Sequence, residues 1–233
     1  MIYLDYQATT PLAPEAFEAM LPWLRDEHAN PHSAHSAGRK AKAAIEVARA
    51  QIAALLPKGG RVVFTSGATE ALNWAIKGVG GPFVTIATEH AAVLDTAHAI
   101  GEARIVPVDR EGLVDRAALA RVLPGARLVE AMLVNNEIGV IQPVTEIAAQ
   151  AHAAGALMLC DAVQGYGRVP IPEGCDLIAL SAHKIHGPKG IGALWIRDGV
   201  ALAPLLHGGD QEGGRSGTLS PALCVGFGVA ARL

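Results

Sequence analysis

The residues with the clearest chemical potential lie at positions 181–192, where the chain reads Ser-Ala-His-Lys-Ile-His-Gly-Pro-Lys-Gly-Ile-Gly. This stretch separates two runs, 176–180 and 191–196, whose apolar residues predict strands. A lysine at the end of a buried strand loses part of its hydration, which lowers its pKa and makes the neutral amine a nucleophile. Such an amine forms a Schiff base with a carbonyl, and pyridoxal 5'-phosphate is its usual partner. The glycine and proline after Lys184 predict a tight turn, which favours this chemistry over a solvated loop lysine.

A candidate phosphate site lies at 65–70 (Thr-Ser-Gly-Ala-Thr-Glu), which joins a predicted strand to a predicted helix. Gly67 lets the backbone approach an anion, and the free N–H groups of the first helical turn point at it. The helix dipole and the hydroxyls of Ser66 and Thr69 add to the attraction. The alternative is an ordinary helix cap formed by Ser66 or Thr69.

Other polar side chains also follow predicted strands. Asp161 ends the apolar run 157–160, and a carboxylate there can keep a pyridine nitrogen protonated, or it can cap a helix. Gln164 could reach the same ligand. His90 follows another strand, where its imidazole could stack on a ring or move a proton, or only cap a helix. The turn at 135–139 (Asn-Asn-Glu-Ile-Gly) has a left-handed turn as its plain alternative.

The elements that must position these residues alternate along the chain. Apolar residues at helical spacing predict helices at 14–24, 37–56, 68–77, 90–100, 116–122 and 144–154. Short runs of apolar and β-branched residues predict strands at 61–65, 83–87, 104–108, 127–134, 157–161, 176–180 and 191–196. Asp115 is the predicted N-cap of the helix at 116–122. This alternation predicts an α/β fold, a three-layer sandwich with a mainly parallel sheet covered on both faces. Ligands of such folds bind where strands end and helices begin.

Composition limits the class of protein. The chain has 233 residues, of which 51% are hydrophobic, and a formal net charge of -3. One sizeable core is expected, and the mild acidity without basic runs argues against a nucleic-acid partner. No apolar stretch reaches transmembrane length and no secretory signal is visible, so a cytoplasmic protein without membrane contact is expected. Three widely spaced cysteines predict neither disulfides nor zinc, and His32 and His35 lack a third ligand, so no metal is expected.

Taken in order, the motifs resemble those of cysteine desulfurases of the NifS/IscS type, within the class V aminotransferase group of pyridoxal phosphate enzymes. The matching stretches cover essentially the whole chain, at 3–11, 30–38, 65–70, 88–90, 134–139, 161–164, 181–184 and 215–218. The resemblance implies the large domain of the fold-type I pyridoxal phosphate enzymes. It implies an N-terminal arm at 1–12, a cofactor-binding domain at 13–233, and no C-terminal small domain in this chain.

The resemblance also implies roles for individual residues. Lys184 would hold the cofactor as a Schiff base and then move protons at the substrate α-carbon. Asp161 would pair with the pyridine nitrogen, Gln164 would bond the ring hydroxyl, and His90 would stack on the ring and assist proton transfer. Asn136 would lie near the substrate and the ring. Four residues would bind the phosphate: Ala68, Thr69, Ser181 and His183. Thr218 would reach the phosphate of a neighbouring subunit, which implies a homodimer.

The activity implied is removal of sulfur from L-cysteine or a related amino acid, with sulfur passed to an iron–sulfur scaffold or another acceptor such as tRNA. In the family a mobile cysteine accepts the sulfur and an arginine holds the substrate carboxylate, both in the part that this chain lacks. Cys160, Cys175 and Cys224 match no catalytic position and are expected to be buried. Sulfur transfer by this chain alone is therefore expected to be impaired. The alternatives are another class V activity, as an aminotransferase or a cysteine or selenocysteine lyase, and a non-catalytic scaffold that binds the cofactor.

Overall fold

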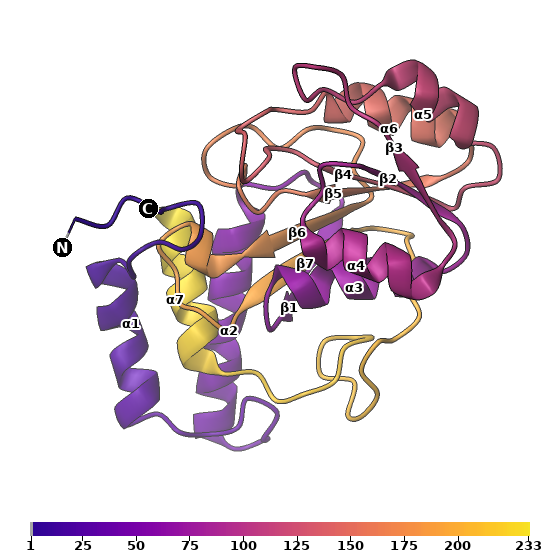
Figure 1. The fold of residues 1–233 in the computed structure, drawn as a ribbon. Coiled ribbons are helices and arrows are strands. Elements are labelled where there is room, and N and C mark those ends of the chain that lie inside the picture. Colours follow the sequence, from indigo (N-terminus) through magenta and orange to yellow (C-terminus); the bar gives the residue numbers. More distant parts are fainter. Residues whose placement is uncertain (1) are drawn as a thin grey trace.

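A single mixed sheet forms the centre of the computed structural model, which describes residues 2–233 (Figure 1). Its seven strands lie in the order β1-β7-β6-β5-β4-β2-β3. Their bounds are Gly60–Thr65 for β1, Phe83–Ile86 for β2, Ala103–Val106 for β3, Leu128–Met132 for β4, Leu157–Asp161 for β5, Leu177–Ser181 for β6 and Gly192–Arg197 for β7. Strand β7 is antiparallel to both of its neighbours, and the other pairs are parallel. The prediction of a mainly parallel sheet is confirmed, although the antiparallel strand was not foreseen.

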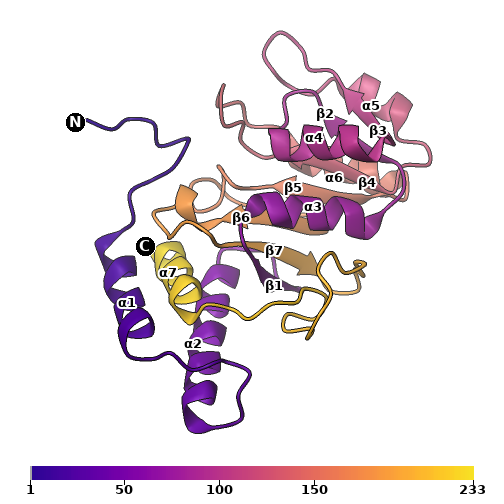
Figure 2. The ribbon, with the colours of Figure 1, turned by 60° about the horizontal axis from the view of Figure 1, so that its bottom comes forward.

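Helices cover both faces of this sheet, so the predicted three-layer sandwich is also confirmed (Figure 2). One face carries α3 (Ala68–Val79) and α4 (Ala91–Ile100). The other carries α2 (Ser36–Ala53), α5 (Arg116–Val122), α6 (Val144–Ala153) and α7 (Pro221–Arg232). Helix α1 (Pro14–Arg25) packs against α7. A search of residues 2–233 finds no helix with both the length and the apolarity needed to cross a membrane.

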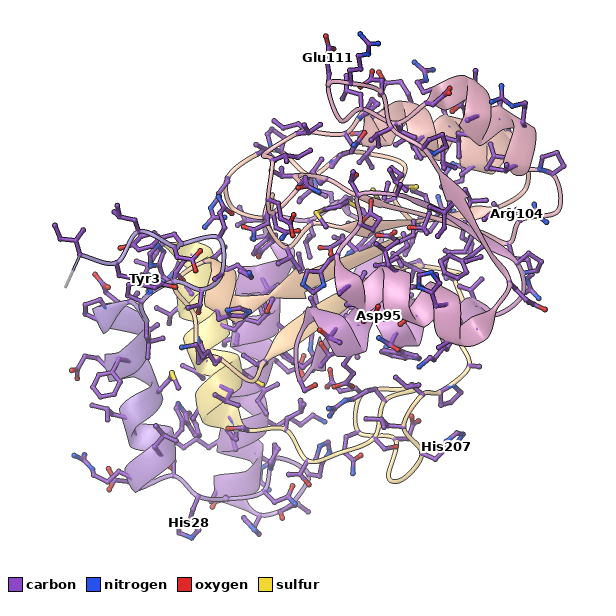
Figure 3. All side chains as sticks on the ribbon, in the orientation of Figure 1. Tyr3, His28, Asp95, Arg104, Glu111 and His207 are labelled. Carbon is purple, nitrogen blue, oxygen red and sulfur yellow. The ribbon has the colours of Figure 1, made fainter. Side chains whose placement is uncertain are left out.

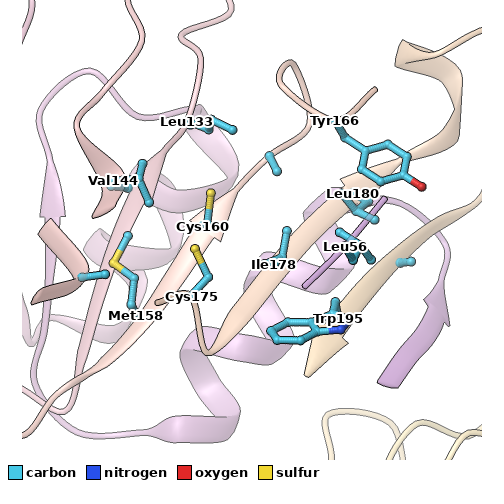
Figure 4. Close-up of a cluster of buried hydrophobic side chains, with 14 of the residues drawn as sticks. Leu56, Leu133, Val144, Met158, Cys160, Tyr166, Cys175, Ile178, Leu180 and Trp195 are labelled. Carbon is cyan, nitrogen blue, oxygen red and sulfur yellow. The ribbon is translucent and has the colours of Figure 1, made fainter. Parts of the chain in front are cut away.

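Alternation along the strands separates two buried apolar clusters. In β1, Val62 and Phe64 face α2 and α7, whereas Val63 faces α3. The cluster on the α2 side includes all three cysteines, which are at most 3% exposed. Figure 4 shows Cys160 and Cys175 beside one another in this cluster. Burial of the three thiols is therefore confirmed.

The element ends follow from local side-chain chemistry. Asp115 caps α5 as predicted, because its Oδ1 accepts from the N–H groups of Ala117 and Ala118, both at 2.9 Å. Strand β6 begins one residue later than predicted, since the Asp176 carboxylate accepts from the N–H of Met158 at 2.7 Å on the adjacent strand. Strands β5 and β6 end on the polar residues Asp161 and Ser181, and these ends help to position the site.

Candidate active site

A cavity of about 550 Å³ lies where β4, β5 and β6 end and where α3 and α4 begin. Every residue predicted to bind the cofactor lines it, with the single exception of Thr218: Ala68, Thr69, His90, Asn136, Asp161, Gln164, Ser181, His183 and Lys184. These residues come from positions 68–184 and meet because the strand ends share one edge of the sheet. The predicted convergence of the strand ends is confirmed.

Lys184 ends a short 3-10 turn, Ala182–Lys184, that directly follows β6. The turn is tight because Gly187 packs against it: a Cβ at this glycine would lie 2.8 Å from the Ala182 carbonyl oxygen. The Lys184 Nζ donates to the carbonyl oxygen of Ala8 at 3.0 Å and also contacts that of Gln7. The sequence did not reveal these partners, because main-chain oxygens of a distant arm leave no signal in residue type.

The charge state of Lys184 is set by burial and by its neighbours. Burial lowers the pKa of its amine, and the nearby Arg168 guanidinium lowers it further, while Asp161 and Asp5 act in the opposite direction. Arg168 also donates to the Lys184 carbonyl oxygen at 2.6 Å, and this hydrogen bond helps to hold the turn in place. The net direction agrees with the lowered pKa expected of a nucleophilic lysine.

Asp161 is 3% exposed and presents its carboxylate to the cavity. Its Oδ1 accepts one hydrogen bond, from the N–H of Val163 at 2.9 Å, within a turn that does not continue as a helix. The helix-cap alternative for Asp161 is therefore wrong. Burial raises its pKa to about 6, while the Val163 N–H and the nearby His90 and Lys184 hold it down.

His90 caps a helix, which is one of the roles that the sequence left open, and its position also allows contact with a ligand. It is the N-cap of α4, where its Nδ1 accepts from the N–H of Ala92 at 3.0 Å, and its ring also lines the cavity. Because Nδ1 is an acceptor, a neutral ring carries its proton on Nε2. The cap fixes the orientation of the imidazole and leaves Nε2 as the atom for exchange with a ligand.

The turn before α3 offers uncapped backbone N–H groups to the cavity. Gly67 occupies the N-cap position without a side-chain cap, so the expected alternative of a Ser66 or Thr69 cap is wrong. A Cβ on Gly67 would meet nothing within 4 Å, which leaves open space at this turn. Gly192 packs against it from behind, where a Cβ would lie 2.7 Å from the Gly67 backbone. An uncapped helix N-terminus of this kind favours an anion.

An ion pair supports this turn, and sequence reasoning missed it. Glu70 Oε2 accepts from the N–H of Ser66 at 2.7 Å, and Arg215 Nε donates to Glu70 Oε1 at 2.8 Å. Burial alone would raise the Glu70 pKa, but Arg215 and the Ser66 N–H together lower it. The pair joins positions 145 residues apart in the sequence, and no spacing rule reaches across that separation.

The two neighbouring asparagines of the 135–139 turn have different roles. Asn135 holds the turn, because its Oδ1 accepts from the N–H groups of Glu137 and Ile138 and its Nδ2 donates to the Thr88 carbonyl at 2.7 Å. Asn136 instead lines the cavity. Its side chain is the one available to a ligand.

The segment that follows β6 supplies the last part of the cavity wall. His183 Nδ1 lies 3.0 Å from the Thr9 hydroxyl, and burial, with the charges of Lys184 and Lys189, lowers its pKa. Lys189 also lines the cavity, which the sequence prediction did not include. Thr218 is exposed and lies away from this wall, in the segment before α7.

Comparison with known proteins gives this geometry a family. The aminotransferase class-V family matches residues 2–233. This chain belongs to the class V aminotransferase family. Two relatives, both called cysteine desulfurase IscS, come from Dictyoglomus turgidum and Rickettsia bellii. Each is 44% identical to the chain over its whole length, and the chain spans 63% and 62% of their own lengths.

Two solved structures have the same fold as this chain. A NifS-like protein from Rickettsia africae has a TM-score of 0.95 at 36% identity and is matched over 100% of this chain and 68% of its own. The protein SspA, solved in complex with cysteine, has a TM-score of 0.92 at 37% identity over 99% of this chain and 72% of its own.

Class V aminotransferases and cysteine desulfurases depend on pyridoxal 5'-phosphate, and the cavity fits each part of that cofactor. The uncapped N-terminus of α3 suits a phosphate group. The buried Asp161 suits a pyridine nitrogen, and Lys184, with its lowered pKa, suits an aldehyde carbon. Three different chemistries within one cavity of about 550 Å³ match three parts of one molecule.

Proposed function

We propose that this chain is the cofactor-binding part of a cysteine desulfurase, an enzyme that takes sulfur from L-cysteine and leaves L-alanine. The observation that carries the proposal is the meeting of Lys184, Asp161 and the uncapped N-terminus of α3 in one cavity. The 44% identity with proteins called cysteine desulfurase supports this choice over another class V activity. The cysteine-bound relative supports the same substrate class.

The cofactor, when bound, supplies a conjugated ring that accepts the electrons left at the substrate α-carbon. Asp161 holds a proton on the ring nitrogen, because an ionised carboxylate at that atom stabilises the cation. Lys184 would bind the aldehyde carbon and, once the substrate amine has displaced it from that carbon, would take the α-proton as a free amine. Its lowered pKa keeps more of the amine neutral and ready to accept that proton.

The other cavity residues orient the reacting groups. The uncapped N–H groups of α3, with Thr69, Ser181 and His183, would bind the phosphate and hold the cofactor in the cavity. His90 would contact the ring, and its Nε2 would exchange a proton with the substrate. Gln164 would bond the ring hydroxyl, and Asn136 would lie on the substrate side.

Sulfur leaves this site by way of a thiol that is not one of the three cysteines. Burial raises the pKa of Cys224 to about 12, and contact with Cys175 together with burial raises that of Cys160. None of the three lines the cavity. A thiolate is needed to attack the substrate sulfur. We therefore propose that another thiol accepts the sulfur, and that the final acceptor is an iron–sulfur scaffold or a similar cytoplasmic protein.

The test separates α-proton chemistry from sulfur release. The chain loaded with pyridoxal phosphate should exchange the α-proton of L-alanine with deuterium from solvent, as followed by proton NMR. Lys184→Ala should abolish the exchange, whereas Lys189→Ala, which removes another lysine of the same cavity, should retain it. Absence of exchange in the loaded wild-type chain would contradict the proposal.

Sulfide release from L-cysteine should be small under the same conditions, even with a thiol reductant present. It should not change in Cys160→Ser, Cys175→Ser or Cys224→Ser. Robust release that one of these substitutions abolishes would identify an internal nucleophile. Robust release that survives all three would indicate a lyase and would replace the desulfurase proposal.

We also propose that the active form is a homodimer in which Thr218 binds the phosphate of the neighbouring subunit. Its exposed position supports this, as does the anchoring of its segment to α2 by Glu212, which accepts from Arg49 at 2.7 and 2.8 Å. Inactive Lys184→Ala and Thr218→Val variants should recover exchange activity when mixed. A monomer in sedimentation with full cofactor content would remove this proposal.

A further inference from the structure

Two fully buried glutamates lie directly behind the cavity wall, and the proposed reaction uses neither. Glu130 occupies the middle of β4 and is 0% exposed, and Glu89 follows β2 and is 6% exposed. Glu130 alternates with Ala131, which belongs to the cluster on the face covered by α2 and α6, so Glu130 points to the α3 and α4 side of the sheet. This is also the side of Met132, which lines the cavity. Carboxylates are rarely buried without a partner.

The hydrogen bonds of these two carboxyl groups leave one oxygen of each without a donor. Glu89 Oε1 accepts from the N–H of Met132 at 2.9 Å, and Glu130 Oε2 accepts from the Thr85 hydroxyl at 2.5 Å. The remaining oxygens, Glu89 Oε2 and Glu130 Oε1, are buried and have no donor among residues 2–233. The two carboxyl groups also act on one another, because the charge of Glu89 raises the pKa of Glu130. A carboxylate oxygen accepts only, so a buried one without a donor favours the form of the carboxyl group that carries a proton.

We propose that Glu89 and Glu130 form a buried pair in which both carboxyl groups keep their protons, and that Asp161 is therefore the ionised carboxylate of the three. The first part rests on the burial of both groups and on their two oxygens without a donor, and it holds for the free protein. The second part rests on the proposed function, because only the cofactor gives the charge on Asp161 a task.

The surroundings of the three groups favour this division of charge. Burial raises the pKa of Glu89 to about 8, and burial with the charge of Glu89 raises that of Glu130. Asp161 is held to about 6, since the Val163 N–H, His90 and Lys184 oppose its burial. Protons are therefore retained on the pair at a pH where Asp161 has lost its own. The titratable groups around the pair are Asp161, Cys160 and, through Asp161, His90 and Lys184.

The pair supports both walls of the site without adding charge to it. Glu89 ties the Thr88–His90 turn to β4 through Met132, and Met132 lies opposite Asp161 in the register of β4 and β5. A doubly ionised pair at this place would disfavour the ionised form of Asp161. We therefore assign Glu89 and Glu130 as positioning residues.

The experiment uses the cofactor-free protein, so its outcome does not depend on the proposed function. A carboxyl that is protonated when folded and ionised when unfolded loses stability as pH rises. Each such group lowers the folding equilibrium constant about tenfold per pH unit. Urea unfolding between about pH 6 and 7.5, a window above the unfolded pKa of a glutamate and below the folded pKa of Glu89, isolates this slope.

Glu130→Gln is the decisive variant, because its amide keeps an acceptor for Thr85 and offers an N–H to Glu89. The folding equilibrium constant of each protein changes with pH. We expect the fall per pH unit in Glu130→Gln to be smaller than the fall in the wild type by a factor of about ten. Glu89→Gln should give the same reduction. Glu111→Gln is the matched control, since Glu111 is exposed at the far edge of the molecule, and it should keep the wild-type slope (Figure 3).

A Glu130→Gln slope equal to that of the wild type would show that Glu130 is ionised in the fold and would overturn the proposal. An equal loss of slope in Glu111→Gln would trace the effect to overall charge and would overturn it too. For Asp161, the pH midpoint of pyridoxal phosphate affinity should be the same in wild type and Glu130→Gln. A lower midpoint in the variant would show that the pair carried charge beside Asp161.

Discussion

Two buried aspartates on neighbouring strands have opposite relations to their surroundings. Asp176, just before β6, is 0% exposed and accepts from the Met158 N–H at 2.7 Å and from His152 Nε2 at 2.8 Å. Its other oxygen forms an ion pair with the Arg197 guanidinium but has no hydrogen-bond partner among residues 2–233. Asp161, at the far end of β5, has one donor and faces a cavity.

The difference between the two aspartates separates a buried charge with a structural role from one with a functional role. Asp176 has its charge paired with Arg197 and one oxygen in contact with two groups of the protein, so its role is complete within the fold. Asp161 retains acceptor capacity toward a space large enough for a cofactor ring, and burial raises its pKa to about 6. A buried carboxylate that the protein leaves unsatisfied is a candidate for binding a ligand.

The largest expected effect comes from Asp161→Asn. An amide cannot keep the ring nitrogen protonated, so α-proton exchange in the loaded protein should fall by about 100-fold or more. Covalent cofactor attachment should persist. Asp176→Asn, measured in the same NMR assay per folded molecule, should remain within a few-fold of wild type, and equal losses in both variants would end the comparison.

The pH dependence of stability should also distinguish Asp161. Its pKa is higher in the fold, at about 6, than its ordinary value of 3.8, so its contribution favours folding at low pH and is lost as pH rises through about 6. The shift corresponds to about 3 kcal/mol above pH 6, as an order of magnitude. Urea unfolding of the cofactor-free protein from about pH 4 to 7 should show that Asp161→Asn removes this loss. If the unfolding free energy of the wild type changed with pH as that of the variant does, ionisation of Asp161 would cost the fold no stability.

The converse variant, Asp176→Asn, should cost stability instead of activity. Removing the charge weakens the contacts with Arg197 and His152 inside the fold, and we expect a loss of about 1–3 kcal/mol in unfolding free energy at neutral pH. Denaturant unfolding of the free protein measures this. Cofactor affinity of the folded fraction should stay unchanged, and a selective loss of affinity would place Asp176 in the site.

A smaller effect is expected at the phosphate cradle, where Glu70 is a satisfied carboxylate beside the cavity. Arg215→Gln leaves the charge of Glu70 uncompensated next to the bound phosphate, so the cofactor Kd should rise by about 5- to 10-fold. Arg61→Gln is the control, because Arg61 donates to the carbonyls of Glu212 and Gly213 in the same segment without contacting the cradle. Fluorescence titration with pyridoxal phosphate would separate the two, and an equal rise would assign the effect to the segment as a whole.

The sequence predicted the parts of this molecule that depend on local pattern. The period of apolar residues located the strands and helices, and polar residues at strand ends located Lys184, Asp161 and His90 in one site. The direction of β7 was not predictable, since an apolar run has the same composition in either direction. The partners of Lys184 in the arm, the Glu70–Arg215 pair and the Glu89–Glu130 pair were missed, because each depends on backbone atoms or on contacts between distant positions.

Borohydride reduction of the loaded protein, followed by peptide mapping, shows whether Lys184 and its neighbours hold pyridoxal phosphate. We expect a stable pyridoxyl adduct on Lys184, which disappears in Lys184→Ala and persists in Lys189→Ala. An adduct on Lys189 or on another lysine of the wild-type chain, or none despite added cofactor, would contradict this expectation.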